Sequence, residues 1–221
     1  MRRQAITPNR DRAVSRFVTP DGFRLLPGRI APAEQAALID TVMAGVAASP
    51  LYQPAMPRTG KPLSVRMTNF GPLGWVTDQE EGYRYEPAHP ETGEPWPALP
   101  QVLLHLWRAE TGWPEPPEAC LVNWYAPGAR MGLHVDNDER AADAPVLSVS
   151  LGDKARFRLG GPGRKDPTAS FVLSTGDVVV LGGTARRCHH GVDRIYPGTS
   201  QALPTDWRPG RINLTLRRVN P

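Results

Sequence analysis

The part of the chain from Cys120 onward is built from short apolar segments separated by paired turn residues, and this pattern restricts the possible folds most. The turn residues include Gly160-Gly161, Gly182-Gly183, Pro197-Gly198 and Pro209-Gly210. Short strands at this spacing are typical of a β-sandwich or jelly roll. The predicted strands are residues 120–126, 132–136, 146–151, 155–159, 170–173, 177–181, 188–192 and 211–217.

The sequence before these strands predicts two helices. Apolar residues recur at helical spacing over Pro32–Ala48, and a proline suits the first turn of a helix. Gln101–Thr111 also has one apolar side, and a glycine and a proline follow it. Around these helices we expect a strand over 63–69, a turn over 71–75 and irregular loops over 53–62 and 78–97. The expected fold is therefore α+β and β-rich, with helices in its N-terminal part.

Charge is distributed unevenly along the chain. The formal net charge is +4, and residues 1–16 alone contain five arginines and one aspartate. Residues 17–153 hold 9 basic and 17 acidic groups, a net charge of −8, whereas residues 154–221 hold 12 basic and 4 acidic groups, a net charge of +8. We expect a loose basic arm over residues 1–22, which would attract phosphates without sequence preference. The overall charge alone therefore does not indicate a nucleic-acid-binding protein.

Composition excludes several classes of protein. Two cysteines, Cys120 and Cys188, are too few for a disulfide framework, which favours a reducing compartment and a cytoplasmic location. The chain has no run of eighteen apolar residues and no apolar stretch after Arg2 and Arg3, so we expect neither a membrane span nor a signal peptide. Nothing in the sequence indicates an obligate dimer, and we expect a monomer.

The first chemical signal is the tripeptide His134-Val135-Asp136, which is weak when it stands alone. Side chains two positions apart in a strand project to the same side, so one metal ion can bind both. With a second histidine, either His189 or His190, they would form the facial triad of non-haem Fe(II) oxygenases. The alternatives are ordinary surface or buried histidines and a zinc site, although the cysteines lack the CxxC spacing of zinc sites.

A second signal is the unbroken alternation over residues 211–217. Arg211, Asn213, Thr215 and Arg217 share one face of the predicted strand, and three aliphatic residues share the other. Guanidinium groups match the geometry of carboxylates, so this face is suited to bind a dicarboxylate. Asn123 and Tyr125 have the same spacing and would add an amide and a hydroxyl. The alternative is a half-buried strand with a solvated polar face.

Four motifs of this chain, taken together and in their order along the sequence, resemble the AlkB family of Fe(II)/2-oxoglutarate-dependent dioxygenases, whose bacterial members repair DNA. The resemblance extends from about Pro32 to Arg217, and further similar segments include Met67-Thr68-Asn69, Leu73-Gly74-Trp75, Gly82-Tyr83-Arg84-Tyr85 and Pro95-Trp96-Pro97. The four motifs are Asn123-Trp124-Tyr125-Ala126-Pro127-Gly128, His134-Val135-Asp136-Asn137-Asp138-Glu139, His190-Gly191-Val192 and Arg211-Ile212-Asn213-Leu214-Thr215-Leu216-Arg217.

The resemblance implies a double-stranded β-helix (jelly-roll) core and assigns the cofactor sites. It implies a single domain over 23–221, with a nucleotide-recognition lid over about 50–118 and the core over 119–221. The family's second histidine directly precedes glycine, which selects His190 over His189. The implied iron ligands are His134, Asp136 and His190. The implied 2-oxoglutarate contacts are Asn123, Tyr125, Arg211, Asn213 and Arg217, with Thr215 either in packing or in a hydrogen bond that supports these contacts.

The resemblance also implies the reaction, which consumes 2-oxoglutarate and O2 at Fe(II). Bases such as 1-methyladenine and 3-methylcytosine in DNA, single- or double-stranded, would be demethylated with release of formaldehyde, succinate and CO2; RNA is left open as a substrate. The base must be flipped out or already unpaired. The implied substrate contacts are Trp75, Tyr83, Arg84, Tyr85, Asp138 and Arg164. Two alternatives remain: a dioxygenase acting on RNA, protein or a small metabolite, and a binding module without activity.

The sequence departs from the family pattern at two positions. Leu216 stands where an aromatic residue usually precedes the last arginine, and Leu181 stands where a tryptophan commonly precedes the glycine pair. We expect both to lie behind the site or on an access route, where they would affect rate and lesion preference. The acidic stretch Thr77–Glu81 would repel a phosphate backbone and favour short single strands.

Overall fold

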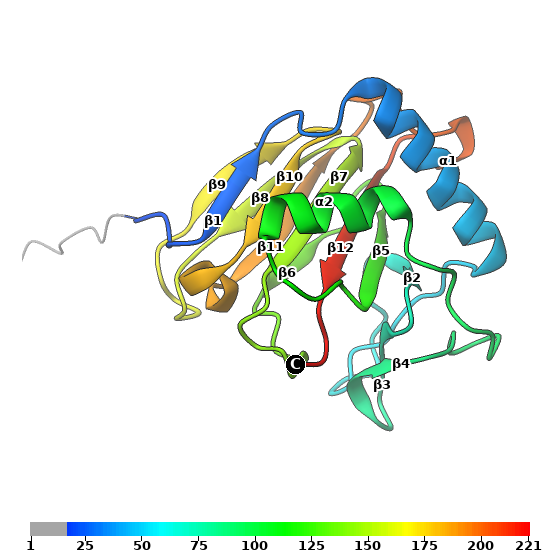
Figure 1. Ribbon diagram of the computed structural model, residues 1–221, viewed down its shortest axis with the longest axis horizontal. Helices are drawn as coiled ribbons and strands as arrows, with labels where there is room; N and C mark the ends of the chain where they lie inside the picture. Colours follow the sequence, from blue (N-terminus) through cyan, green and yellow to red (C-terminus); the bar gives the residue numbers. More distant parts are fainter. Residues whose placement is uncertain (1–16) are drawn as a thin grey trace, which may run out of the picture.

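The structure, a computed structural model, describes residues 17–221 and shows two antiparallel sheets packed as a jelly roll (Figure 1). The larger sheet has the order β1-β10-β7-β12-β5-β2, and the smaller one has the order β6-β11-β8-β9. This arrangement confirms the predicted fold class. The strands of the larger sheet are β1 (Phe23–Leu26), β2 (Arg66–Phe70), β5 (Ala119–Tyr125), β7 (Val146–Gly152), β10 (Val178–Leu181) and β12 (Arg211–Arg217), and those of the smaller sheet are β6 (Met131–His134), β8 (Lys154–Leu159), β9 (Ala169–Leu173) and β11 (His190–Tyr196).

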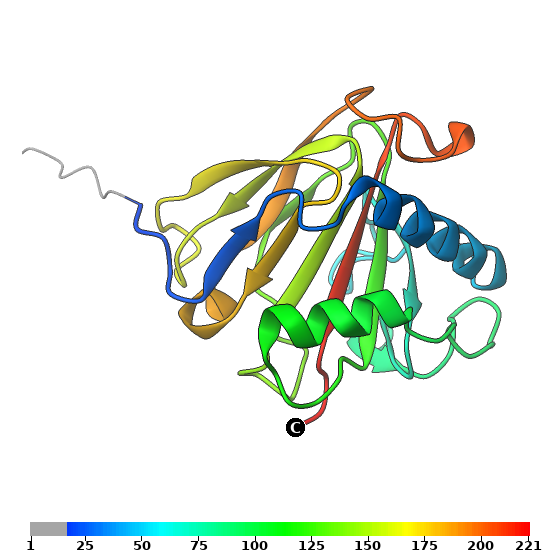
Figure 2. The same ribbon diagram turned by 45° about the horizontal axis from the view of Figure 1, so that its top comes forward.

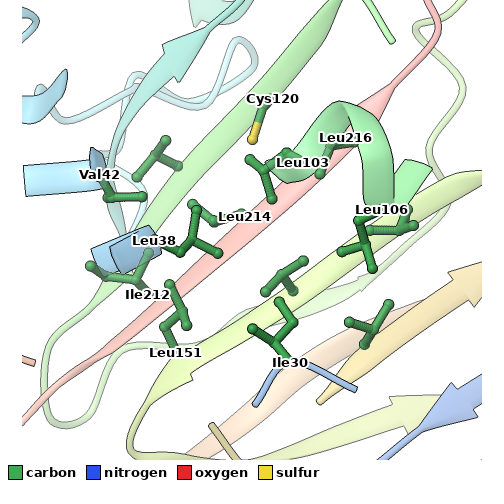
Figure 3. Packing of buried hydrophobic residues seen from close by; sticks show 14 of the residues in the cluster. Ile30, Leu38, Val42, Leu103, Leu106, Cys120, Leu151, Ile212, Leu214 and Leu216 are labelled. Carbon is green, nitrogen blue, oxygen red and sulfur yellow. The ribbon is translucent and has the colours of Figure 1, made fainter. Parts of the chain in front are cut away.

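Two helices cover the outer face of the larger sheet (Figure 2). Helix α1 (Pro32–Ala48) and helix α2 (Gln101–Thr111) have the predicted bounds. Their apolar sides pack on the aliphatic face of β12 and its neighbours, with Leu38 and Leu103 close to Leu214 (Figure 3). The alternation in β12 therefore separates an apolar face under the helices from a polar face that lies between the two sheets.

Close packing of α1 depends on a glycine in its interior. A Cβ on Gly45 would lie 2.1 Å from the ring of Phe70 in β2. Glycine in a helix costs about 1 kcal/mol relative to alanine. Here the missing side chain lets the helix backbone approach the aromatic ring, so the cost is offset by burial of Phe70, which is 2% exposed.

The largest difference from the prediction lies between Gly74 and Glu86. We predicted a turn and an irregular loop here, but the chain forms a two-stranded hairpin from β3 (Gly74–Asp78) and β4 (Gly82–Glu86). The hairpin projects from one end of the sheets (Figure 1). The two strands were not predicted because they contain acidic residues and glycines, which have a low propensity for strands.

Two further elements define the boundary of the predicted lid. The strand predicted over 63–69 is β2, which pairs with β5 and belongs to the larger sheet. Helix α2 packs on the same sheet. Within 50–118, the hairpin and its flanking loops are therefore the part outside the two main sheets, and Val76 and Trp96 pack against Leu121 of the larger sheet.

The first strand of the larger sheet was not predicted. β1 pairs with β10, and Gly182 donates a backbone hydrogen bond to the carbonyl of Gly22 just before β1. Most of the predicted arm, residues 1–16, lies outside the described residues, whereas Phe17 packs against the core. Among residues 17–221, no helix has the length and apolar content needed to cross a membrane.

Candidate active site

The predicted iron ligands come together at one end of the smaller sheet. His134 ends β6, His190 begins β11, and the two residues are direct partners in the strand ladder. The carboxylate of Asp136 lies beside both rings, 3.5 Å from Nε2 of His134 and 3.6 Å from Nε2 of His190. One potential ligand atom from each residue lies within 4.8 Å of the other two, and residues 17–221 hold no other such cluster.

Backbone carbonyls fix the orientation of both imidazoles. Nδ1 of His134 lies 2.8 Å from the carbonyl of Gly132, and Nδ1 of His190 lies 3.1 Å from that of Cys188. A proton on Nδ1 of each ring would satisfy these carbonyls and leave Nε2 free to bind a metal. Such outer hydrogen bonds are typical of histidines that bind metals.

The carboxylate of Asp136 has one oxygen free for a metal. Arg217 donates to Oδ1 at 2.7 Å, whereas Oδ2 is buried without a hydrogen-bond partner. Burial opposes ionisation, but Arg217 and the two histidines outweigh it and hold the pKa of Asp136 well below its usual range. A buried, ionised and unpartnered oxygen beside two imidazole nitrogens fits a divalent cation such as Fe(II), with three positions left open.

The predicted 2-oxoglutarate contacts line the space between the sheets. Arg211 is fully buried, donates one bond to Ser150 at 2.9 Å, and has two further nitrogens, Nε and Nη1, without a partner. Burial lowers the pKa of Arg211 to about 10. Tyr125 is its partner in the ladder, and burial raises the pKa of this phenol to about 12. A buried guanidinium with free donors is suited to the far carboxylate of a dicarboxylic acid.

The two asparagines lie one ladder step further along the same face. Asn123 and Asn213 are paired in the ladder between β5 and β12. The amide of Asn213 donates to Ser148 at 2.7 Å and accepts a bond from Thr215 at 3.1 Å. Thr215 thus orients an amide, which agrees with its expected supporting role. Ser148 and Ser150 were missed, although their alternation within the strand at 146–151 was a usable signal.

Arg217 lies at the metal end of this face. Besides Asp136, it contacts Glu139 at 2.7 Å and the hydroxyl of Tyr85 at 3.2 Å. These partners outweigh burial and raise the pKa of Arg217. Its Nε remains without a partner, so one donor is free for the near end of 2-oxoglutarate.

A cavity of about 440 Å³ contains the metal cluster and opens beside the hairpin. Four of the predicted substrate contacts line it: Trp75, Tyr83, Asp138 and Arg164. Trp75 stacks on Tyr83 with centroids 5.5 Å apart, and its indole nitrogen donates to Asp138 at 2.7 Å. The aromatic ring and the carboxylate expected to contact the base are therefore held against each other at the cavity wall.

Two predicted substrate contacts, Arg84 and Tyr85, do not line the cavity. Arg84 forms ion pairs with Asp78, Glu81 and Glu86 at 2.8, 3.0 and 2.8 Å, and these contacts on the hairpin occupy its guanidinium. Tyr85 donates to Glu139, accepts a bond from Arg217, and does not line the cavity. Carboxylates hold both side chains in the described structure, and their contact with the substrate stays a prediction.

The two residues that depart from the family pattern, Leu181 and Leu216, lie in different parts of the structure. Leu181 lines the cavity, in agreement with an access position. Leu216 lies on the opposite face of its sheet, in the core under the helices (Figure 3). The cluster of residues that could hold a metal contains His190 and not His189.

Comparison with known proteins gives consistent matches over nearly the whole chain. The sequence profile of the 2OG-Fe(II) oxygenase superfamily matches residues 22–217. The chain is 54% identical over 201 residues to the alpha-ketoglutarate-dependent dioxygenase AlkB homolog of Caulobacter vibrioides. The aligned region covers 90% of this chain and 88% of the relative. It is 46% identical over 175 residues to the alpha-ketoglutarate-dependent dioxygenase AlkB of Escherichia coli, spanning 77% and 78% of the two chains.

Solved structures give the same fold. The structure of OsALKBH1 superimposes with a TM-score of 0.76 at 30% identity and covers 92% of this chain and 99% of its own. An oxidoreductase of the 2OG-Fe(II) oxygenase family from Burkholderia pseudomallei superimposes with a TM-score of 0.53 at 16% identity, covering 88% and 84% of the two chains, and supports the fold alone.

Proposed function

The chain belongs to the AlkB family of 2OG-Fe(II) dioxygenases, which dealkylate nucleic-acid bases oxidatively, and we propose a specific substrate for it. Its substrates are N-methylated bases in single-stranded DNA. The lesions are 1-methyladenine and 3-methylcytosine. The proposal rests on one observation: two buried groups without full hydrogen bonding, one anionic and one cationic, line the same cavity. The free oxygen of Asp136 suits a metal, and the free donors of Arg211 suit a dicarboxylate.

Residues of this chain provide both binding sites for the cofactors. His134, Asp136 and His190 would hold Fe(II), which supplies the O2-dependent oxidation that hydroxylates an N-methyl carbon. Arg211 and Tyr125 would bind the far carboxylate of 2-oxoglutarate, and Arg217 would bind its near end. Asp136 remains ionised because Arg217 holds its pKa low, so this carboxylate need not lose a proton before a metal binds.

The cavity wall provides a binding site for a flat, cationic base. Trp75 offers a stacking surface for the base, opposite the ring of His134. Methylation at these ring nitrogens makes the base a cation, which is attracted by the indole face and by the carboxylate of Asp138. An undamaged base lacks this charge, so these contacts favour the lesion.

The charge of the hairpin favours a single strand over a duplex. Asp78, Glu80 and Glu81 lie at its turn, and the nearby Arg84 is already paired with two of them. A second strand would bring further phosphates toward these carboxylates. A duplex would also require unpairing of the lesion, whereas a single strand would not.

The substrate proposal is tested by formaldehyde release from matched oligonucleotides. One 3-methylcytosine sequence is presented as single-stranded DNA, as duplex DNA and as single-stranded RNA, at the same enzyme and salt concentration. We expect the highest kcat/KM on single-stranded DNA. Equal or faster reaction of the duplex contradicts the strand preference, and faster reaction of RNA transfers the proposal to RNA.

We further propose that the enzyme works as a monomer in the cytoplasm. All residues of the metal cluster and of the anion site come from one chain, so the site is complete without a second copy. The free thiols of Cys120 and Cys188 are buried. Light scattering at working concentration tests the first statement, because a stable dimer contradicts it, and subcellular fractionation tests the second.

A further inference from the structure

Arg186 is a buried arginine that none of the assigned binding sites uses. It is 4% exposed and lies in the short 3-10 helix η1 (Gly183–Arg187). Its three nitrogens bind three different groups: Nε donates to the carbonyl of Ala144 at 2.9 Å, Nη1 to the carbonyl of Asp136, and Nη2 to Glu139 at 2.8 Å. Arg186 thus contacts both ends of the loop that begins at a metal ligand.

Glu139 connects Arg186 to a second arginine. Its side chain is fully buried, and Oε2 accepts the bond from Arg186. Oε1 accepts bonds from Arg217 at 2.7 Å and from the hydroxyl of Tyr85. The carboxylate therefore lies between two guanidinium groups, and both of its oxygens are occupied.

Arg217 extends these contacts to the metal site. Its Nη2 donates to Oδ1 of Asp136 at 2.7 Å, which leaves Oδ2 without a partner. Asp136 is consequently held twice: Arg186 binds its carbonyl, and Arg217 binds its carboxylate. Glu139 links these two arginines, so the four residues form one connected network.

The N-terminal segment fixes the position of η1. Ala185 donates to the carbonyl of Asp21, and Gly182 donates to the carbonyl of Gly22. Gly22 has a φ of +80°, and a Cβ there would lie 2.2 Å from the carbonyl oxygen of Gly182. This contact requires glycine, and it places Arg186 against the loop of Asp136.

We infer that Arg186 is a positioning residue for the metal centre, acting through Glu139 and through the carbonyls of Asp136 and Ala144. It neutralises Glu139, which would otherwise attract Arg217 and repel the carboxylate of Asp136. It also holds the backbone from 136 to 144 in place. Without Arg186, Asp136 loses its orientation toward the two histidines, although the three ligands themselves are unchanged.

The test measures Co(II) binding by calorimetry and by the visible absorption of the bound ion. Loss of an outer partner typically weakens metal affinity 10- to 100-fold. For Arg186→Met we expect an affinity at least about tenfold weaker and an altered Co(II) spectrum. The matched control is Arg187→Met, because the neighbouring Arg187 pairs only with the exposed Asp143 in the described structure. It should bind Co(II) like the unchanged protein.

A double variant tests the route through Glu139. Removing both charges in Arg186→Met/Glu139→Gln eliminates the unbalanced carboxylate, so we expect part of the lost affinity to return. A double variant that binds as weakly as Arg186→Met overturns this route.

Arg186→Lys keeps a charge but not the three-way bonding, and it decides the test if the methionine variant does not fold. A folded Arg186→Lys or Arg186→Met protein with unchanged Co(II) affinity and spectrum overturns the inference. The inference rests on the metal centre of the proposed function, but Co(II) binding is measured without nucleic acid. A wrong substrate would therefore leave this result unaffected.

Discussion

His134 and His190 face each other across the ladder between β6 and β11, with ring centroids 4.6 Å apart. Each ring is held by the carbonyl two residues before it. The backbone register thus sets the separation of the two imidazoles, and Asp136 completes the triangle. A metal at this position joins two strands, so its binding should stabilise the folded protein.

Metal binding should weaken as the pH falls, because protons compete for His134. Burial opposes protonation of this ring, but the carboxylate of Asp136 and the carbonyl of Gly132 outweigh it, so its pKa is raised above 6.5. Competition therefore begins at a higher pH than at an ordinary histidine. Calorimetry with Co(II) between about pH 8 and pH 6 should show falling affinity. A constant affinity across this range contradicts the assignment.

Arg211→Met should weaken 2-oxoglutarate binding and raise the stability of the ligand-free protein. Loss of one partner of a buried charged pair costs about 2–5 kcal/mol, so KM for 2-oxoglutarate should rise about 30-fold or more. In the ligand-free protein the same guanidinium is buried with two unpartnered nitrogens. Its replacement by an apolar side chain should therefore raise Tm.

Arg211→Lys provides the control for this prediction. Lysine keeps the charge but cannot donate the paired hydrogen bonds of a guanidinium, so most of the increase in KM should remain. A lower Tm together with unchanged KM in Arg211→Met would show that the residue has only a structural role.

Trp75→Ala should weaken binding of the methylated oligonucleotide without affecting the cofactors. Stacking of a base on an aromatic side chain is worth about 1–3 kcal/mol, which corresponds to a KM about 5- to 150-fold higher. Trp75→Phe keeps a ring and should recover much of the loss. Turnover of 2-oxoglutarate without nucleic acid serves as the internal reference, and a decrease there instead would place the residue in cofactor binding.

Arg164→Gln should weaken nucleic-acid binding uniformly across sequences. Arg164 lines the cavity, and its side chain makes only a 3.5 Å contact with the carbonyl of Leu133. If it binds a phosphate, the slope of log K against log salt should decrease by about one. Arg194→Gln, which removes an exposed arginine outside the cavity lining, is the matched control. An unchanged salt slope in Arg164→Gln rules out the phosphate contact.

The parts of the fold that the sequence predicts are those determined by local periodicity. Helix α1 and strand β12 have their predicted bounds, because each repeats its apolar residues over many positions. β1 is four residues long and has no alternation, so only its pairing with β10 makes it a strand. The hairpin of β3 and β4 was missed for a similar reason.

In the site, too, residues within short motifs could be predicted, whereas contacts between residues far apart in the sequence could not. His134, Asp136 and His190 were identifiable from their motifs. The contacts of Glu139 with Arg186 and of Trp75 with Asp138 join residues 47 and 63 positions apart. Short motifs carry no information on such pairs.

The most direct test of the account measures formaldehyde and succinate released from a single-stranded 3-methylcytosine oligonucleotide, with and without 2-oxoglutarate. The purified protein with Fe(II) should release both products only when 2-oxoglutarate is present, with at least one succinate for each formaldehyde, and His134→Ala should release neither. Formaldehyde release that is independent of 2-oxoglutarate, or that persists in folded His134→Ala, would contradict the assigned metal centre and the reaction derived from it.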